Sequence, residues 1–293
     1  MTSARKKPLQ IAPYVFVLPN LIIFIVFIVI PAFANFYLGM FKTSPIAPPV
    51  FVGLANFRYI FLIDDLFKRS LSNLFSFAVF DVVAIVVLSV VIGVLLNQSI
   101  RGKSFFRSAF FFPVLLSPVV VALVWGWILN SRFGLLNATL IWLGFKGQPW
   151  LLQPDLAKAW TVGVHVWATV GFFAIIILAG LQSIPETLYE AAEMDGSTPI
   201  QNFFYITLPM LAPSITTVSM LSMIRAFEIF DHVYILTGGG PGTATMMVVQ
   251  YVYRAAFELD QQGRAAAASL VLFVILLSLA LVQYILGRRQ ESV

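Results

Sequence analysis

The sequence predicts an all-α integral membrane protein with six transmembrane helices. Of its 293 residues, 60% are hydrophobic and 11% are charged, and the mean hydropathy is +0.92. Soluble domains carry about 25% charged residues. The charged residues are clustered, which leaves apolar windows of about 18 residues or more, long enough to cross a hydrocarbon core of about 30 Å. These windows lack the alternation of barrel strands, and an open backbone is not stable in lipid, so helices are expected.

The six predicted spans cover residues 14–36, 74–96, 105–129, 160–181, 213–230 and 265–286. The first resembles a signal peptide, because three cations at positions 5–7 precede an apolar run and Ala32-Phe33-Ala34 follows it. Its apolar run is longer than a usual signal core, so we expect it to stay in the protein as the first membrane helix. Prolines in or beside the other spans are tolerable, because neighbouring helices satisfy the freed carbonyls.

The distribution of Lys and Arg favours a cytoplasmic location for both termini. With that orientation, eight cations lie inside and nine outside, so a raw count decides nothing. The inside cations are packed into three short segments next to helix ends (residues 5–7, 101–107 and 288–289), whereas the outside ones are spread over long loops. Short loops carry most weight in the positive-inside rule.

Composition and motifs exclude several kinds of site. The chain has no cysteine and only two histidines, which excludes disulfides and thiolate chemistry and makes a metal site improbable. Its net charge of +5 does not indicate nucleic-acid binding, since the cations flank apolar spans instead of forming one patch. Gly102-Lys103-Ser104 ends like a phosphate-binding loop but lacks the first glycine and joins two membrane helices. We therefore expect no nucleotide and no cofactor on this chain.

An acidic segment, residues 183–209, interrupts the apolar pattern between the fourth and fifth spans. Ser183 with Glu186 and Thr198 with Gln201 have the spacing of capping boxes, which predicts two short helices on the cytoplasmic side. Gly196 lies between them and can adopt the positive φ that ends a helix. Four acids (Glu186, Glu190, Glu193 and Asp195) suit a basic partner surface, but a solvated interfacial loop explains them equally well.

The sequence of this segment also resembles a known family. Glu190-Ala-Ala-x-x-Asp195-Gly196, followed by Phe203 and Leu208-Pro209, looks like the EAA loop of permeases in bacterial binding-protein-dependent ABC importers. The run 236–241 (Leu-Thr-Gly-Gly-Gly-Pro) resembles the signature after the fifth helix of carbohydrate-uptake members, the maltose and glycerol-3-phosphate permease type. The resemblance covers nearly the whole chain.

The resemblance implies a MetI-like type I importer permease in the bacterial inner membrane. Residues 1–70 would hold the first helix and first external loop, and residues 71–293 the five-helix core. The expected partners are a second permease, two ATP-binding subunits that carry ATP and Mg²⁺, and an extracytoplasmic solute-binding protein. The positions that would couple to the ATPase are Glu190, Ala191, Ala192, Asp195 and Gly196.

Polar groups inside spans are costly and therefore mark functional candidates. Arg225 and Glu228 share a helix face, either as a structural ion pair or as part of a substrate cavity. Similar permeases place substrate ligands at positions matching Phe227, Glu228 and Asp231. His165 and Asp81 are weaker candidates. Trp167, with Trp125 and Trp127, is either a platform for sugar rings or an interface anchor.

Two other function classes fit the sequence less well. A secondary transporter driven by an ion gradient would be expected to show inverted repeats, which we do not find. A membrane-embedded enzyme needs a tight acid–base or metal constellation that the sparse ionisable residues do not offer. We expect the glycine-rich run 238–242 to be an external loop that contacts the binding protein or re-enters the cavity. The solute, sugar or other, and the identity of the second permease stay open.

Overall fold

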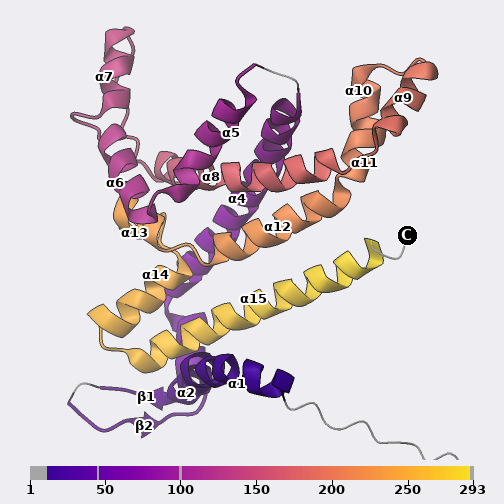
Figure 1. Ribbon diagram of the computed structural model, residues 1–293. Helices are drawn as coiled ribbons and strands as arrows, with labels where there is room; N and C mark the ends of the chain where they lie inside the picture. The colour runs from indigo at the N-terminus through magenta and orange to yellow at the C-terminus, as the bar shows by residue number, and fades with distance from the viewer. Residues whose placement is uncertain (1–11, 45, 99–100, 291–293) are drawn as a thin grey trace, which may run out of the picture.

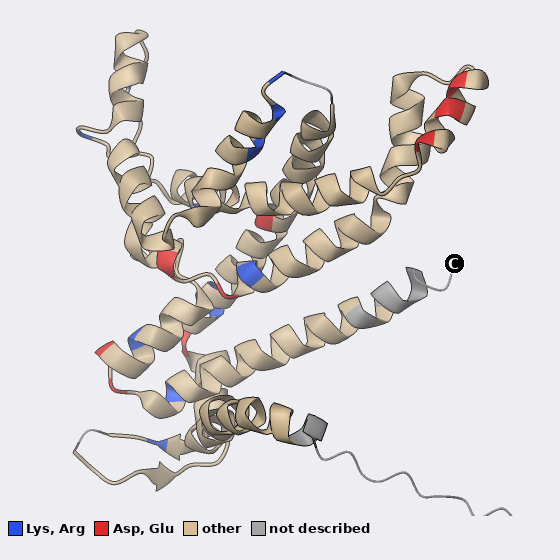
Figure 2. Cartoon of the chain, viewed as in Figure 1, with Lys and Arg blue, Asp and Glu red and all other residues tan. Residues whose placement is uncertain are grey.

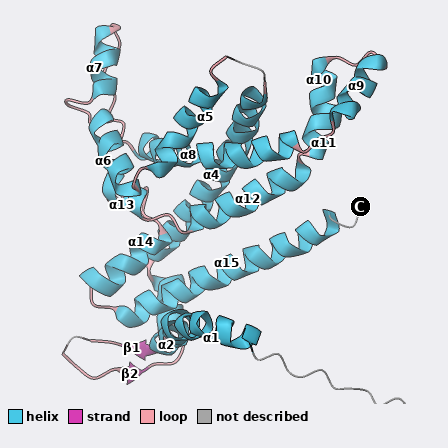
Figure 3. Ribbon diagram, viewed as in Figure 1, coloured by secondary structure: helices cyan, strands magenta, loops and turns pink. Residues whose placement is uncertain are grey.

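The computed structural model describes residues 12–44, 46–98 and 101–290, and the basic run at residues 5–7 lies outside these ranges. The described chain is built almost entirely of helices, with one short β-hairpin (Figures 1 and 3). Four helices are long and apolar enough to cross a membrane, and two bent helix pairs bring the number to six when each pair is taken as one span. The prediction of a six-span helical membrane protein is therefore supported.

Four spans are continuous helices. The first joins α1 (Ala12–Phe24), η1 (Ile25–Val29) and α2 (Ile30–Leu38), and the others are α4 (Asp65–Asn97), α8 (Pro154–Gln182) and α15 (Gln262–Gln290). α4 begins well before the predicted residue 74. Its first turn is capped by the Asp64 side chain, which accepts hydrogen bonds from the backbone N–H groups of Leu66 and Phe67. Helix α4 therefore extends beyond the N-terminal edge of the apolar window.

The third span is broken, and the prediction of one helix over 105–129 is wrong. α5 (Lys103–Phe111) and the 3₁₀ helix η3 (Phe112–Leu115) meet α6 (Pro118–Ile128) at 100°. Leu116 and Ser117 between them have ψ angles of 143° and 136°. A residue before proline is pushed out of the helical region, so Pro118 forces this break.

The fifth span is bent and ends earlier than predicted. α10 (Pro199–Asn202), η4 (Phe203–Thr207) and α11 (Leu208–Met210) meet α12 (Ala212–Phe227) at 62°. The expected end at residue 230 is wrong, because Glu228 and Phe230 leave the helical conformation. The elements that follow are α13 (Asp231–Leu236), α14 (Val248–Tyr253) and η5 (Arg254–Glu258).

The remaining elements are α3 (Ala55–Arg58), η2 (Tyr59–Ile63), α7 (Leu135–Trp142), α9 (Glu186–Met194) and the antiparallel hairpin of β1 (Phe41–Lys42) and β2 (Val50–Phe51). α4 lies at the centre of the fold and packs against both α8 and α12. Figure 1 shows α9, α10 and the C-terminal end of α15 on the right, with β1, β2 and α14 on the left.

Glycine at position 171 allows the closest helix contact in this core. A Cβ atom there would lie 1.9 Å from the backbone oxygen of Phe110, so α8 and α5 meet backbone to backbone. Small residues at helix contacts are typical of membrane proteins, where close packing replaces the hydrophobic effect as the driving force. A larger side chain at this position would separate the two helices.

Candidate functional site

Helices α9 and α10 form a pair between α8 and α12 that corresponds to the predicted acidic segment. α9 ends in a Schellman motif: the N–H of Ser197 bonds to the carbonyl of Ala192, and the N–H of Gly196 bonds to that of Glu193, both at 3.0 Å. Gly196 has a φ of +80°, and a Cβ added there would meet no atom within 4 Å. The predicted left-handed turn at Gly196 is confirmed, and it is the backbone angle that requires glycine.

One of the two predicted capping boxes is present. The Thr198 hydroxyl accepts a bond from the N–H of Gln201, and the Gln201 side chain accepts one from the N–H of Thr198, so α10 begins as predicted. The box of Ser183 with Glu186 is wrong. Ser183 caps the end of α8, where its hydroxyl donates to the carbonyl of Gly180, and Pro185 precedes α9 without a side-chain cap.

Two side-chain contacts hold the α9–α10 pair together. The hydroxyls of Tyr189 on α9 and Thr207 on η4 are 2.9 Å apart, and the Ser197 hydroxyl donates to Asn202 Oδ1 at 2.6 Å. A hollow of about 330 Å³ lies between the pair and the ends of α4 and α8 and is lined in part by Asn97 and Leu181. Beside it, Tyr189 and Phe203 pack against the core that includes Leu181, so the pair is joined within itself and rests on the helices behind it.

The outward surface of this pair is acidic and apolar. Figure 2 shows acidic positions gathered along α9, at the end of the molecule where α9 and α10 meet. The acids Glu186, Glu190, Glu193 and Asp195 are exposed, as are Ala191 and Gly196, while Ala192 is half-buried. Large apolar side chains are exposed beside them, with Met194 at 89%, Tyr205 at 79% and Ile200 at 72%. Exposed apolar groups with charged neighbours are typical of an interaction surface.

Arg225 lies on α12 with its guanidinium 4.7 Å from the centre of the Phe172 ring and 5.7 Å from that of Phe173, both on α8. Among the described residues, no carboxylate lies within ion-pairing distance of Arg225, so the ion pair with Glu228, one of the two alternatives from the sequence, is not formed. Arg225, Glu228 and Asp231 are all exposed on this chain. Three charged groups are therefore available at the junction of α12 and α13.

The two predicted aromatic candidates differ in accessibility. Phe227 is 1% exposed, and its ring packs edge-on against Phe75 at 5.4 Å in the core, so in this conformation it supports the junction from behind. Trp167 is 42% exposed, and its ring lies 5.5 Å from that of Trp125. Trp125 also contacts Trp160 at 5.7 Å, so the indoles line up along α6 and α8.

His165 does not face open space. Its Nδ1 lies 2.7 Å from Asp81 Oδ1, and Asp81 is fully buried. His232 on α13, which the sequence analysis did not single out, places its ring edge-on to His165 at 5.4 Å. Burial, and then the neighbouring His165, lowers the pKa of His232 to about 4, so this ring is neutral at pH 7. Among the described residues, no group of three acidic or imidazole side chains is placed to hold a metal ion.

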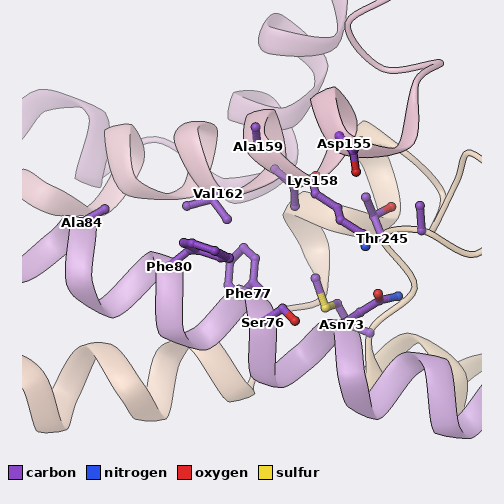
Figure 4. A pocket seen from close by; sticks show the side chains of 13 residues that line it. Asn73, Ser76, Phe77, Phe80, Ala84, Asp155, Lys158, Ala159, Val162 and Thr245 are labelled. Atoms are coloured by element: carbon purple, nitrogen blue, oxygen red, sulfur yellow. The ribbon is translucent and has the colours of Figure 1, made fainter.

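A cavity of about 490 Å³, which no sequence pattern predicts, lies between α4 and α8 (Figure 4). Asn73, Ser76, Phe77 and Phe80 on α4 face Asp155 and Lys158 on α8 across it. The segment after the glycine-rich run closes one side with Thr245. No motif marks these residues, because residues about 80 positions apart come together only when the two helices pack.

Residues 85–292 match the family described as the inner membrane component of binding-protein-dependent transport systems. The chain is 36% identical to the probable ABC transporter permease protein YurN of Bacillus subtilis, over 94% of this chain and 95% of that one. It is 32% identical to the trehalose/maltose transport system permease protein MalF of Thermococcus litoralis, over 98% and 97%. A bacterial ABC transporter involved in the import of the acidic polysaccharide alginate has the same fold, with a TM-score of 0.80 and 25% identity over 95% of both chains.

Proposed function

Since this chain belongs to the family of inner membrane components of binding-protein-dependent transport systems, we propose that it is the path by which an ATP-driven importer brings a sugar or sugar derivative into the cytoplasm. The family consists of membrane transport components and not of enzymes. Support for a carbohydrate comes from the substrates that name its relatives, trehalose and maltose in one and alginate in another.

The α9–α10 pair is the proposed contact with the ATP-hydrolysing subunits, which would carry ATP and Mg²⁺. Glu190, Ala191, Asp195 and Gly196 present an exposed surface at its tip, and half-buried Ala192 lets a partner backbone approach closely. Three residues separate α8 from α9, and Leu211 alone separates α11 from α12. A push on the pair therefore acts on two spans with little slack, which is the observation that carries the proposal.

This contact implies an orientation. ATPase subunits of an importer are cytoplasmic, so the α9–α10 pair would face the cytoplasm together with the C-terminal end of α15, which lies on the same side in Figure 1. The hairpin of β1 and β2 and helix α14 would then face the solute-binding protein. A second, homologous permease would complete the path. Arg225 and Glu228 are exposed in the isolated chain, and charged groups are costly in lipid, so a partner would cover them.

The solute would pass the junction of α12 and α13. Arg225, Glu228 and Asp231 offer both a donor and acceptors for sugar hydroxyls there, and Trp167 offers an exposed ring face. Phe227 and His165 would shape the wall from behind, since both are buried. ATP hydrolysis would therefore act on the α9–α10 pair at one end of the molecule and move solute at the α12–α13 junction near its middle.

Charge reversal at Glu190 tests the coupling role. In proteoliposomes that contain the complete importer, Glu190→Lys should abolish ATP-dependent uptake and sugar-stimulated ATPase activity, because a basic partner surface would then meet a cation. Asp65→Lys is the matched control, since Asp65 is an exposed acid at the far end of α4. Wild-type uptake by Glu190→Lys at equal membrane abundance would overturn the assignment.

A further inference from the structure

The cavity between α4 and α8 has the features of a small-molecule site. Its volume of about 490 Å³ lies within the range of about 300–1,000 Å³ that ligand pockets occupy. Most of its wall is apolar, from Phe77, Phe80, Val162 and Met247 among others, and a few polar groups stand at one end. Ligand sites combine an apolar wall with a few placed polar groups in this way.

The polar groups are concentrated toward the N-terminal ends of both helices. Figure 4 shows Asn73, Asp155 and Lys158 at one end of the cavity and Ala84 with Val162 at the other. Helix α8 runs from Lys158 toward α9, so the polar end lies on the side of the molecule away from the α9–α10 pair. On the proposed orientation, a solute arriving from outside meets this end before it reaches Arg225.

Two of the lining residues are already committed to holding the wall in place. Asn73 Nδ2 donates to the backbone oxygens of Thr243 and Met246, at 2.8 and 3.1 Å. The Thr245 hydroxyl donates to the carbonyl of Gly240 at 2.8 Å, and its oxygen lies 2.6 Å from the hydroxyl oxygen of Thr237. The Asn73 bonds hold the segment after the glycine-rich run against α4, and the Thr245 bonds tie that segment to the run itself, so the segment closes one side of the cavity.

Other polar atoms at this end are free to bind a ligand. Among the described residues, the Lys158 ammonium forms no ion pair, so it can donate, and Asp155 on the preceding turn can accept. The Ser76 O–H donates to the carbonyl of Ser72. The Ser76 oxygen and the Oδ1 atom of Asn73 keep lone pairs that can accept further bonds. A sugar hydroxyl both donates and accepts, so a mixture of one cation with several acceptors fits a polyol.

We propose that this cavity is an outer subsite for a carbohydrate ring, in which Lys158, Asp155, Asn73 and Ser76 bind hydroxyls and Phe77 and Phe80 contact the apolar face of the ring. The subsite rests on the proposed function for the class of its ligand. The solute would bind here first, next to the glycine-rich segment, before it reaches the charged junction of α12 and α13.

The first test asks whether the cavity holds water, and it needs no knowledge of the solute. Because the chain has no cysteine, Ser76→Cys in the purified importer carries the chain's only thiol. A charged, membrane-impermeant methanethiosulfonate reagent should label it much faster than Val87→Cys, a residue 55% exposed on the same helix and outside the cavity. Equal, slow labelling of both thiols would mean that lipid or a partner helix fills the space, and would overturn the subsite.

The second test measures binding. For a sugar that the wild-type importer takes up, chosen from maltose, trehalose and alginate oligosaccharides, Lys158→Gln should raise KM roughly tenfold and leave kcat unchanged, as loss of one charged hydrogen bond predicts. Lys146→Gln, at an exposed lysine outside the cavity, should leave KM unaltered. An unchanged KM for Lys158→Gln would overturn the subsite.

The two proposals fail in different ways. If the wild-type importer takes up none of these sugars, the carbohydrate assignment fails and the subsite's ligand class fails with it, while labelling at Ser76→Cys still reports whether the cavity is open to water. If the wild type transports and both variants behave as their controls, only the subsite fails.

Discussion

Helices α7 and α9 have the same ending but opposite surfaces. Each is eight or nine residues long and ends in a Schellman motif, with a glycine at φ +85° (Gly144) or +80° (Gly196). In α7 the N–H of Phe145 bonds to the carbonyl of Leu140 at 2.8 Å, which repeats the bond from Ser197 to Ala192. The exposed side chains of α7 are largely apolar, with Trp142 at 84%, whereas those of α9 are largely acidic.

The comparison separates what shapes a short helix from what gives it a role. The glycine sets only the turn, so it does not distinguish the two helices. α7 is fixed in place by Asn137, which bonds to the backbone of Ser131 and Gln148 and to the Trp150 indole. α9 follows α8 after only three residues and carries exposed acids, whereas eleven residues separate α7 from α8. These two differences are why we propose α9, and not α7, as the coupling element.

The sharpest way to break this comparison is proline in both turns. Gly196→Pro and Gly144→Pro each impose a φ near −65° where it is positive, and each removes an N–H that bonds at 3.0 Å. We expect Gly196→Pro to abolish ATP-dependent uptake at normal membrane abundance, while Gly144→Pro retains most of it. Equal loss of uptake in both would show that the turn matters only for folding.

The next largest effect is expected in the buried interior, which contrasts with the exposed α9–α10 pair. Asp81→Leu removes one partner of the Asp81–His165 contact and leaves the other buried without it. A loss of about 1–3 kcal/mol of stability is expected, as for other buried polar groups that lose their hydrogen-bond partner. Thermal unfolding of the purified chain in detergent measures this. A change no larger than that of Asp65→Leu, at an exposed acid, would mean that the pair contributes little.

The smallest effect sharpens the local account of α10. Thr198→Ala removes the cap that begins this helix and should cost about 1 kcal/mol. Hydrogen exchange should rise at the first amides of α10 and leave α9 unaltered, and uptake should fall only modestly. Thr139→Ala, in the middle of α7, is the control, because its hydroxyl bonds within one helix and caps nothing.

These regions also differ in how well the sequence predicted them. Gly196 and the Thr198 box act through neighbours in sequence, so their geometry was predicted from residue types alone. The Ser183 box failed because α8 continues to Gln182 and its last turn uses the serine. Asp81 and His165 are 84 positions apart, and no local pattern indicates that they meet. The cavity at Lys158 likewise depends on how two helices pack. The break before Pro118 is instead a local effect of the proline, which the prediction of one continuous helix overlooked.

The tie between Tyr189 and Thr207 has a thermodynamic consequence. Because it joins α9 to the segment that leads into α12, a partner that binds the pair more tightly in one arrangement of the spans shifts the population of that arrangement. Linkage is reciprocal: if docking at α9 changes the affinity for solute by some factor, solute changes the affinity of docking by the same factor. The binding constant of the ATPase measured with and without sugar thus reports on the distant site.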